Sequence, residues 1–146
     1  MTSEKIPIPV AYACKSSVSK EKLLECAEKA NARSGNEFVQ LFKNSKVVRE
    51  RLLAAYFNML LRKEENIMRS NSMAIELLLL VSGQMNISKA LKDFGVDGNE
   101  LILFATSEKL AKLFMKCSGI ENGKKLRLDF VSKETSRVAV AELLYG

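Results

Sequence analysis

The sequence offers few of the side chains that enzymes use for acid–base or nucleophilic catalysis. Its 146 residues include no histidine, so a His-based metal site, a Ser-His-Asp triad and a Cys-His pair cannot form within the chain. Glu64 and Glu65 are adjacent and would diverge on a helix, and neither a GxGxxG nor a GxxxxGKS/T loop is present. We therefore expect no catalytic, cofactor-binding or metal-binding site, and a protein that is not an enzyme.

Basic side chains gather instead in one segment. Residues 43–69 contain seven Lys or Arg and three Glu, a net charge of +4 in a chain whose net charge is +6. The cations lie at the two ends of a long apolar stretch, and such clusters attract the phosphates of nucleic acids. A solvated helix face that only keeps the protein soluble would give the same pattern. Composition alone leaves both interpretations open.

A group of small polar residues follows this basic segment. Ser70, Asn71 and Ser72 precede the longest apolar run, as N-caps of a helix do, and Glu76 would lie near the positive end of the helix dipole. A capped helix N-terminus with cations nearby favours phosphate binding. Capping alone is the alternative role of the same residues.

The elements that must position these residues follow from periodicity and punctuation. Apolar alternation or short apolar runs predict strands over 8–14, 37–42, 101–105 and 125–131, the second lying beside the first. Helical spacing predicts helices between Ser19 and Gly35, over 47–61, 73–82 and 87–94, between Ser107 and Gly119, and after Ser132. Gly95 is expected to end its helix in the left-handed conformation. We expect one compact α+β domain over residues 1–146, with a central mixed or antiparallel sheet covered by helices.

The cysteines and the N-terminal residues give information about the cellular compartment of the protein. Cys14, Cys26 and Cys117 are an odd number without CxxC spacing, which favours reduced, buried thiols. The N-terminus lacks a basic region followed by a long apolar core, and Glu76 interrupts the apolar run at 75–81, which is too short to span a bilayer. We expect a cytoplasmic protein that does not bind membranes.

The stretch 70–96 carries a resemblance to a known family. It reads SNSMAIELLLLVSGQMNISKALKDFGV: a Ser/Asn cap, Glu76 before Leu-rich residues, a Ser-Gly turn, Ile87, and an Ala-containing helix that ends in Phe-Gly-Val. This pattern resembles the small kinase-associated, TPRKB-like subunit of the KEOPS tRNA-modification complex in its archaeal form. The chain departs from it at Met85 and Asn86, where archaeal relatives tend to carry Arg-Gln.

The resemblance implies a non-catalytic subunit that binds the small kinase/ATPase of KEOPS directly and the other subunits indirectly. It also implies binding of tRNA, at the single-stranded 3′ CCA tail, in support of threonylcarbamoyl-adenosine modification. For tRNA we expect phosphate contacts from cations and caps, and base contacts from two apolar side chains: Lys46, Arg49, Arg69, Ser70, Asn71 and Ser72, then Tyr56 and Ile75. For the kinase we expect the last helix and the short helix at 87–94 to contribute Val140, Leu143, Leu144, Lys89 and Lys92.

Two other functions fit parts of the sequence. The segment 86–101 has the layout of a helix-turn-helix, which would make the protein a general nucleic-acid-binding module. The element that should read base edges is, however, the apolar run 101–105. A protein-only scaffold whose basic face has no RNA role is the third hypothesis.

Overall fold

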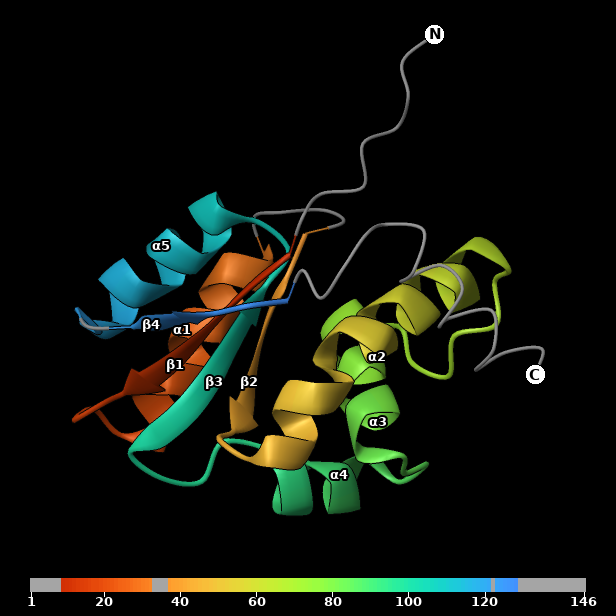
Figure 1. Cartoon of the computed structure of the whole chain (residues 1–146), viewed down its shortest axis with the longest axis horizontal. Helices are drawn as coiled ribbons and strands as arrows, with labels where there is room; N and C mark the ends of the chain where they lie inside the picture. Colours follow the sequence, from red (N-terminus) through yellow and green to blue (C-terminus); the bar gives the residue numbers. More distant parts are fainter. Residues whose placement is uncertain (1–8, 33–36, 122, 129–146) are drawn as a thin grey trace, which may run out of the picture.

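A four-stranded antiparallel sheet separates two layers of helices in the computed structural model (Figure 1). The structure describes residues 9–32, 37–121 and 123–128. The sheet has the order β2-β3-β1-β4. Its strands are β1 (Val10–Lys15), β2 (Val39–Lys43), β3 (Glu100–Ala105) and β4 (Lys124–Leu126). The predicted α+β class with a helix-covered sheet is confirmed, and each strand pairing is antiparallel.

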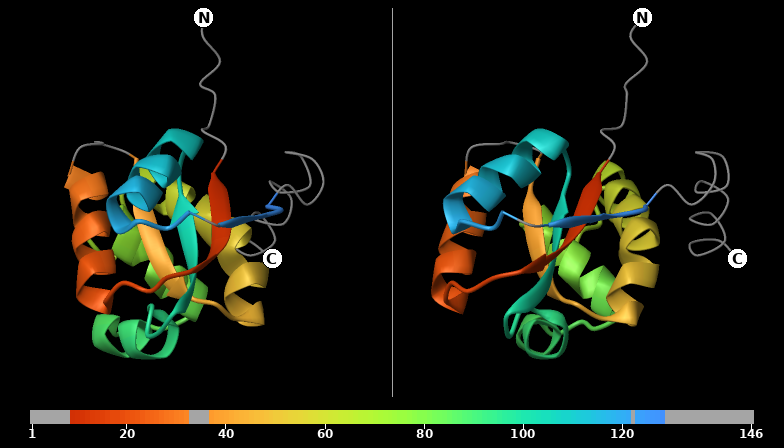
Figure 2. Two further views of the ribbon diagram at one scale, coloured as in Figure 1. Left: turned by 90° about the vertical axis from the view of Figure 1, so that its left-hand side faces the viewer. Right: turned by 60° about the vertical axis from the view of Figure 1, so that its left-hand side comes forward.

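The helices cover the two faces of the sheet unequally (Figures 1 and 2). α1 (Lys20–Ala32) and α5 (Glu108–Ser118) lie on one face, and their apolar sides meet the alternate strand residues Leu101, Leu103 and Ala105. α2 (Lys46–Glu64), α3 (Met73–Ser82) and α4 (Ile87–Phe94) lie on the other face, against Ile102 and Phe104. β3 is buried on both faces because each side of it meets a helical layer.

The position of β2 differs from the sequence prediction. β2 does not lie beside β1, because β3 pairs with both strands and runs between them. The alternation of apolar residues in β1 and β2 fixes which face each side chain takes, but it does not choose a neighbour. The continuous apolar run of β3 is what suits the central place.

Helix ends agree with the predicted caps, with one exception. The side chains of Ser72, Asn86 and Ser107 accept backbone N–H groups at the starts of α3, α4 and α5. Gly83 and Gly119 end α3 and α5 in the left-handed conformation. Gly95 does not: its φ is −74° and its ψ 163°, and its N–H donates to the Leu91 carbonyl oxygen at 3.0 Å. A Cβ at Gly95 would lie 2.4 Å from that oxygen, so close approach is the reason for glycine there.

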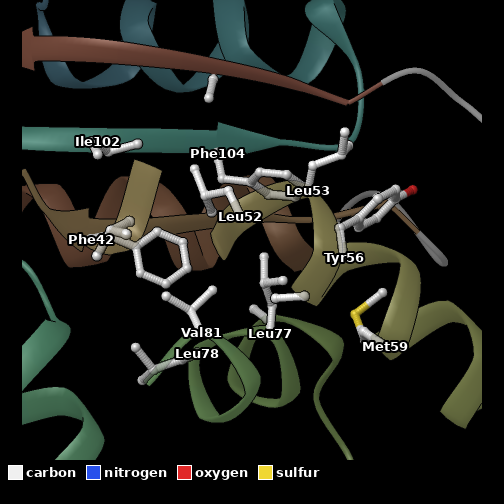
Figure 3. Close-up of a cluster of buried hydrophobic side chains, with 14 of the residues drawn as sticks. Phe42, Leu52, Leu53, Tyr56, Met59, Leu77, Leu78, Val81, Ile102 and Phe104 are labelled. Atoms are coloured by element: carbon white, nitrogen blue, oxygen red, sulfur yellow. The ribbon is translucent and has the colours of Figure 1, made fainter. Parts of the chain in front are cut away.

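The core between α2, α3 and the sheet holds the two helices that flank the α2–α3 loop, and Figure 3 shows its side chains. Leu52, Met59 and Leu77 are fully buried, and Tyr56 is stacked at a tilt against Phe104 with ring centroids 5.3 Å apart. Apolar residues surround α2 more widely than one stripe because α3 and the sheet both pack against it. The two helices are therefore held firmly on each side of the loop that joins them.

The cysteine prediction needs correction. Cys26 of α1 and Cys117 of α5 form a disulfide with their Cα atoms 5.7 Å apart, so only Cys14 is a free thiol. The two residues are 91 positions apart in sequence and lack a spacing motif, which is why the sequence did not reveal the pair. Cys14 is buried in the sheet, and burial raises the pKa of its thiol to about 11.

The end of the chain bears on two predictions. The fourth strand is described over Lys124–Leu126; residues 127–128 of the predicted 125–131 are not in the strand, and residues 129–131 lie outside the described residues. The predicted final helix, with Val140, Leu143 and Leu144, lies outside the described residues.

Candidate functional site

Glu76 organises the loop between α2 and α3. Its side chain is completely buried, and its Oε1 accepts the backbone N–H groups of Arg69 and Ser70, each at 2.9 Å. Its Oε2 lies 3.9 Å from Nη1 of Arg62 and 3.7 Å from Nε of Arg69. We call Glu76, Arg62 and Arg69 the Glu76 cluster. A carboxylate that accepts two backbone donors fixes the path of the loop.

The Glu76 cluster carries a net positive charge at the surface. Both arginine side chains are partly exposed, 26% for Arg62 and 29% for Arg69, while the carboxylate between them is enclosed. One negative charge cannot neutralise two guanidinium groups, so an anion approaching from solvent meets an excess of one positive charge. Two guanidinium groups held side by side suit the oxygens of a phosphate.

The residues between this cluster and α3 have capping roles. The Ser72 side chain accepts the N–H of Ile75, and the Ser70 side chain accepts the N–H of Ser72. Asn71 is exposed between them. Arg69, Ser70, Asn71 and Ser72, which were predicted to bind RNA, therefore do lie together at the N-terminus of a ten-residue helix. Capping explains two of the serines without a ligand.

A shallow groove of about 340 Å³ opens between α2 and α3. Its lining combines small apolar side chains with polar ones at the rim: Glu50, Arg51, Ala54, Ala55, Asn58 and Leu80. Arg51 donates to the Val81 carbonyl oxygen at 3.2 Å, which fixes one end. Asn58 accepts a hydrogen bond from Nε of Arg62 at 3.3 Å, and this bond joins the groove to the Glu76 cluster.

Two of the predicted RNA cations lie elsewhere. Lys46 and Arg49 are at the start of α2, whereas Arg69 follows its end, and a 19-residue helix is about 28 Å long. Lys46 pairs with Glu50 at 3.7 Å, and Arg49 donates to Asn44 at 3.1 Å. The structure therefore divides the predicted site into two separate groups of cations.

The two apolar side chains predicted to contact RNA bases, Tyr56 and Ile75, are both removed from solvent to some extent. Tyr56 is only 2% exposed and belongs to the core, where burial raises the pKa of its hydroxyl (Figure 3). A stacking role for its ring is thus wrong, because a base could reach it only by displacing Phe104 or its neighbours. Ile75 is partly buried against the same core. Ile67, 53% exposed within the α2–α3 loop, is an apolar side chain that the sequence reasoning missed.

Other missed residues were visible as signals in the sequence. Arg62 was counted among the cations but not assigned to RNA, although it precedes Arg69 by only seven positions. Glu76 was interpreted as a partner of the helix dipole. Its burial and its contacts across six and seven residues depend on how the loop returns to α2, which no local pattern specifies.

α4 presents an apolar side to solvent at the opposite end of α3. Ile87 and Leu91 are 43% and 45% exposed and lie one turn apart, and Met85 precedes them at 81%. The predicted kinase-binding residues Lys89 and Lys92 are exposed on the same short helix. We call these five residues the α4 face. Apolar residues at this exposure are typical of an interaction surface when they occur as a group.

The element after α4 decides the helix-turn-helix alternative. It is β3, the buried central strand, whose residues Leu101 to Ala105 are fully enclosed. A recognition helix that offers polar side chains to base edges is therefore absent from this position, so the helix-turn-helix layout predicted over residues 86–101 is wrong. Within the described part of the chain, no helix is long and apolar enough to cross a membrane. The same residues contain no group of three His, Cys, Asp or Glu side chains placed to hold a metal ion.

Comparison with known proteins identifies the family. A search among curated proteins finds no significant match. A family model described as kinase binding protein CGI-121 matches residues 17–143 of the 146, a span that includes the Glu76 cluster and the α4 face. The match supports the resemblance to TPRKB-like subunits. The chain therefore belongs to the CGI-121 family of kinase-binding proteins.

Proposed function

We propose that this protein is a non-catalytic, cytoplasmic KEOPS subunit of the archaeal type, which binds the small kinase/ATPase of the complex and the 3′ CCA tail of tRNA. In this role it supports threonylcarbamoyl-adenosine modification by presenting tRNA to the complex. The observation that carries the proposal is the Glu76 cluster beside the capped start of α3, within a chain of a kinase-binding family.

The Glu76 cluster supports binding of a single-stranded tail for two reasons. Arg62 and Arg69 provide paired donors for a backbone phosphate, and the α3 N-terminus adds a favourable dipole. The groove between α2 and α3 begins at Asn58 and offers Ala54 and Leu80 as an apolar floor for an unstacked base. Ile75 and Ile67 lie at the loop side of the same region as further apolar contacts.

The RNA role is tested with three ligands: intact tRNA, tRNA without its 3′ tail, and duplex DNA, each at two salt concentrations. We expect the intact tRNA to bind more tightly than the tail-less form, and Arg69→Ala to remove most of that difference. Lys20→Ala, an exposed cation on α1, is the matched control and should preserve it. Equal, steeply salt-dependent binding of all three ligands would support a general nucleic-acid module, and no binding would support the protein-only scaffold.

Arg49→Ala resolves the role of the separate cations at the start of α2. If the tail contacts only the Glu76 cluster, this substitution leaves the tail-dependent difference unchanged, because Arg49 lies near the other end of α2, about 20 Å from that loop. A loss equal to that of Arg69→Ala would mean that the RNA follows the whole length of α2, as the sequence prediction including Lys46 implies.

The α4 face supports kinase binding. Its three apolar side chains can be buried by a partner, and Lys89 and Lys92, which lie further round the exposed surface of α4, can meet acidic residues of the kinase at the rim. The predicted contribution of Val140, Leu143 and Leu144 remains part of the proposal. Because α4 lies at the C-terminal end of α3 and the Glu76 cluster at its N-terminal end, RNA and kinase would occupy opposite ends of one helix.

Kinase association is tested with Leu91→Asp. Leu91 is 45% exposed, so the substitution should not unfold the protein but should weaken kinase binding by at least about tenfold through burial of a charge. Leu24→Asp on α1 is the control, since Leu24 is 41% exposed on the other face of the sheet. Leu144→Asp tests the C-terminal contribution in the same assay. Unchanged affinity in a folded variant would remove that surface from the interface.

A further inference from the structure

A second basic surface lies on the side of the sheet that α1 and α5 cover. Residues 108–127 contain six Lys or Arg and two Glu, a net charge of +4 that equals that of residues 43–69. The expectation that the positive charge concentrates in 43–69 is therefore incomplete. The structure decides which of these six cations share a surface.

α5 contributes three lysines in one row. Lys109, Lys112 and Lys116 are exposed, and their spacing of three and four residues places them on one side of the helix. The two flanks of α5 are occupied: Cys117 is bonded to α1, and Glu108 contacts β4. The row lies between these flanks and points to solvent. It spans about 10 Å along the helix axis.

β4 and the residue that follows it add two cations to the same side. Lys125 donates to Oε2 of Glu108 at 3.2 Å, which places its ammonium group beside the first turn of α5. Leu126 and Leu128 pack into the core on the opposite face of the sheet. Because side chains alternate along an extended chain, Arg127 between them points to the α5 side. Lys124 shares the orientation of Leu126 and is not part of this surface.

The charges of this surface are poorly compensated. Glu108 is engaged by the Tyr12 hydroxyl as well as by Lys125. Within the described ranges, Lys109, Lys112, Lys116 and Arg127 have no acidic side chain within 4 Å. Four lysines elsewhere do pair with acids, namely Lys15, Lys29, Lys43 and Lys46. A patch with such an uncompensated excess attracts polyanions.

We propose that Lys109, Lys112, Lys116, Lys125 and Arg127 form a second RNA-binding surface that holds the phosphate backbone of a double-stranded stem. The row of three lysines is about as long as four successive phosphates of one strand, which recur roughly every 3.4 Å along a duplex axis. The proposal rests on the proposed function, in that the stem belongs to the tRNA whose tail the Glu76 cluster binds.

The composition of the surface favours a nucleic-acid backbone over other partners. Protein interfaces are depleted of lysine and enriched in aromatic residues, whereas this surface has four lysines and no aromatic side chain among its five members. Stable contact with a lipid surface would need several apolar side chains to insert beside the cations, and on the described α5 only Leu113, 37% exposed, is a large hydrophobic residue in the exposed class. Unpaired lysine ammonium groups can bind backbone phosphates, and such contacts hold a nucleic acid without reading its base sequence.

The test uses a blunt RNA hairpin without a single-stranded tail, titrated against the full chain at several salt concentrations. Combined substitution Lys109→Ala, Lys112→Ala and Lys116→Ala should lower the steepness of log K against log salt by about 2 to 3, close to one for each phosphate that is no longer neutralised. The charge-matched control replaces Lys15, Lys20 and Lys29 by alanine, exposed residues of β1 and α1. It should leave the slope close to that of the wild type.

Three results would overturn the proposal. The wild-type chain fails to bind the hairpin; both triple variants lose affinity equally, which reduces the effect to net charge; or the α5 variant keeps RNA binding but loses binding to phosphatidylserine vesicles. The proposed function can fail independently, because the hairpin has no tail. Tail-independent tRNA binding that is still lost on substitution of α5 would refute the tail site and preserve this surface.

Discussion

Replacing Glu76 by glutamine tests the account of the α2–α3 loop most directly. Glutamine has the same shape, and its carbonyl can still accept the N–H groups of Arg69 and Ser70 that lie 2.9 Å from Oε1. It removes the negative charge and places an amide NH₂ toward Arg62 and Arg69, whose nitrogens lie 3.9 and 3.7 Å from Oε2. Donors would then face donors in an enclosed site, and two partly buried arginines would lose their counter-ion.

The expected loss of stability follows from these contacts. Hydrogen bonds to a charged acceptor contribute about 1.5–3 kcal/mol and neutral ones about 1 kcal/mol, so two weakened bonds lose roughly 2 kcal/mol. The two ion pairs add roughly another 1 kcal/mol, reduced by the partial exposure of both arginines. A total of about 3 kcal/mol corresponds to a fall in Tm of roughly 6–12 °C for a chain of this length.

Urea unfolding followed by circular dichroism measures this change. Glu50→Gln is the matched control, because Glu50 makes an exposed pair with Lys46 and should change the free energy of unfolding by less than about 0.5 kcal/mol. Glu76→Gln should also weaken tail-dependent tRNA binding at temperatures where the variant is folded. A loss of stability as small as that of the control would refute the claim that Glu76 holds the loop.

Three further outcomes are expected. Gly95→Ala should destabilise the fold by about 1–3 kcal/mol in urea unfolding, because a Cβ would press on the Leu91 carbonyl oxygen; a neutral result would contradict the close approach. Thiol titration in denaturant should count one free cysteine, Cys14, without reductant and three after reduction. Three free thiols before reduction would contradict the Cys26–Cys117 bond. Removal of this disulfide should lower the free energy of unfolding by roughly 4–5 kcal/mol, because the bond closes a long loop. Stability should fall between about pH 9 and pH 11, because the unfolded chain releases the Cys14 proton near pH 9 whereas the folded chain keeps it to about pH 11, and Cys14→Ala should reduce that fall.

Local residue patterns determined the elements of this protein. Ser72, Asn86 and Ser107 were recognisable as caps, and Gly119 as the stop of α5, because those preferences depend on a few neighbouring atoms. The continuous apolar run of β3 likewise predicted a strand buried on both faces. The family resemblance also depended on such a local stretch, and the CGI-121 match agrees with it.

The separation of the predicted RNA cations could have been predicted from the sequence by calculating the length of the helix between them. A helix over 47–61 already spans about 20 Å, so Lys46 and Arg69 could not converge on one phosphate. The length of the helix does not show whether Tyr56 lies in the core or on the surface. Apolar residues surround α2, and which of its sides faces the sheet depends on where α3 packs.

Only the tertiary structure decided the features that carry the functional proposals. The return of the chain after α2 buries Glu76 between two arginines, and sheet order brings Lys125 of β4 to the first turn of α5. In both arrangements the residues meet because helices and strands pack together. The apolar pattern of each element would allow it to pack against several different neighbours, so the pattern alone does not specify the contact. Sequence determined which side chains were available for phosphate and kinase contact, and packing determined which of them share a surface.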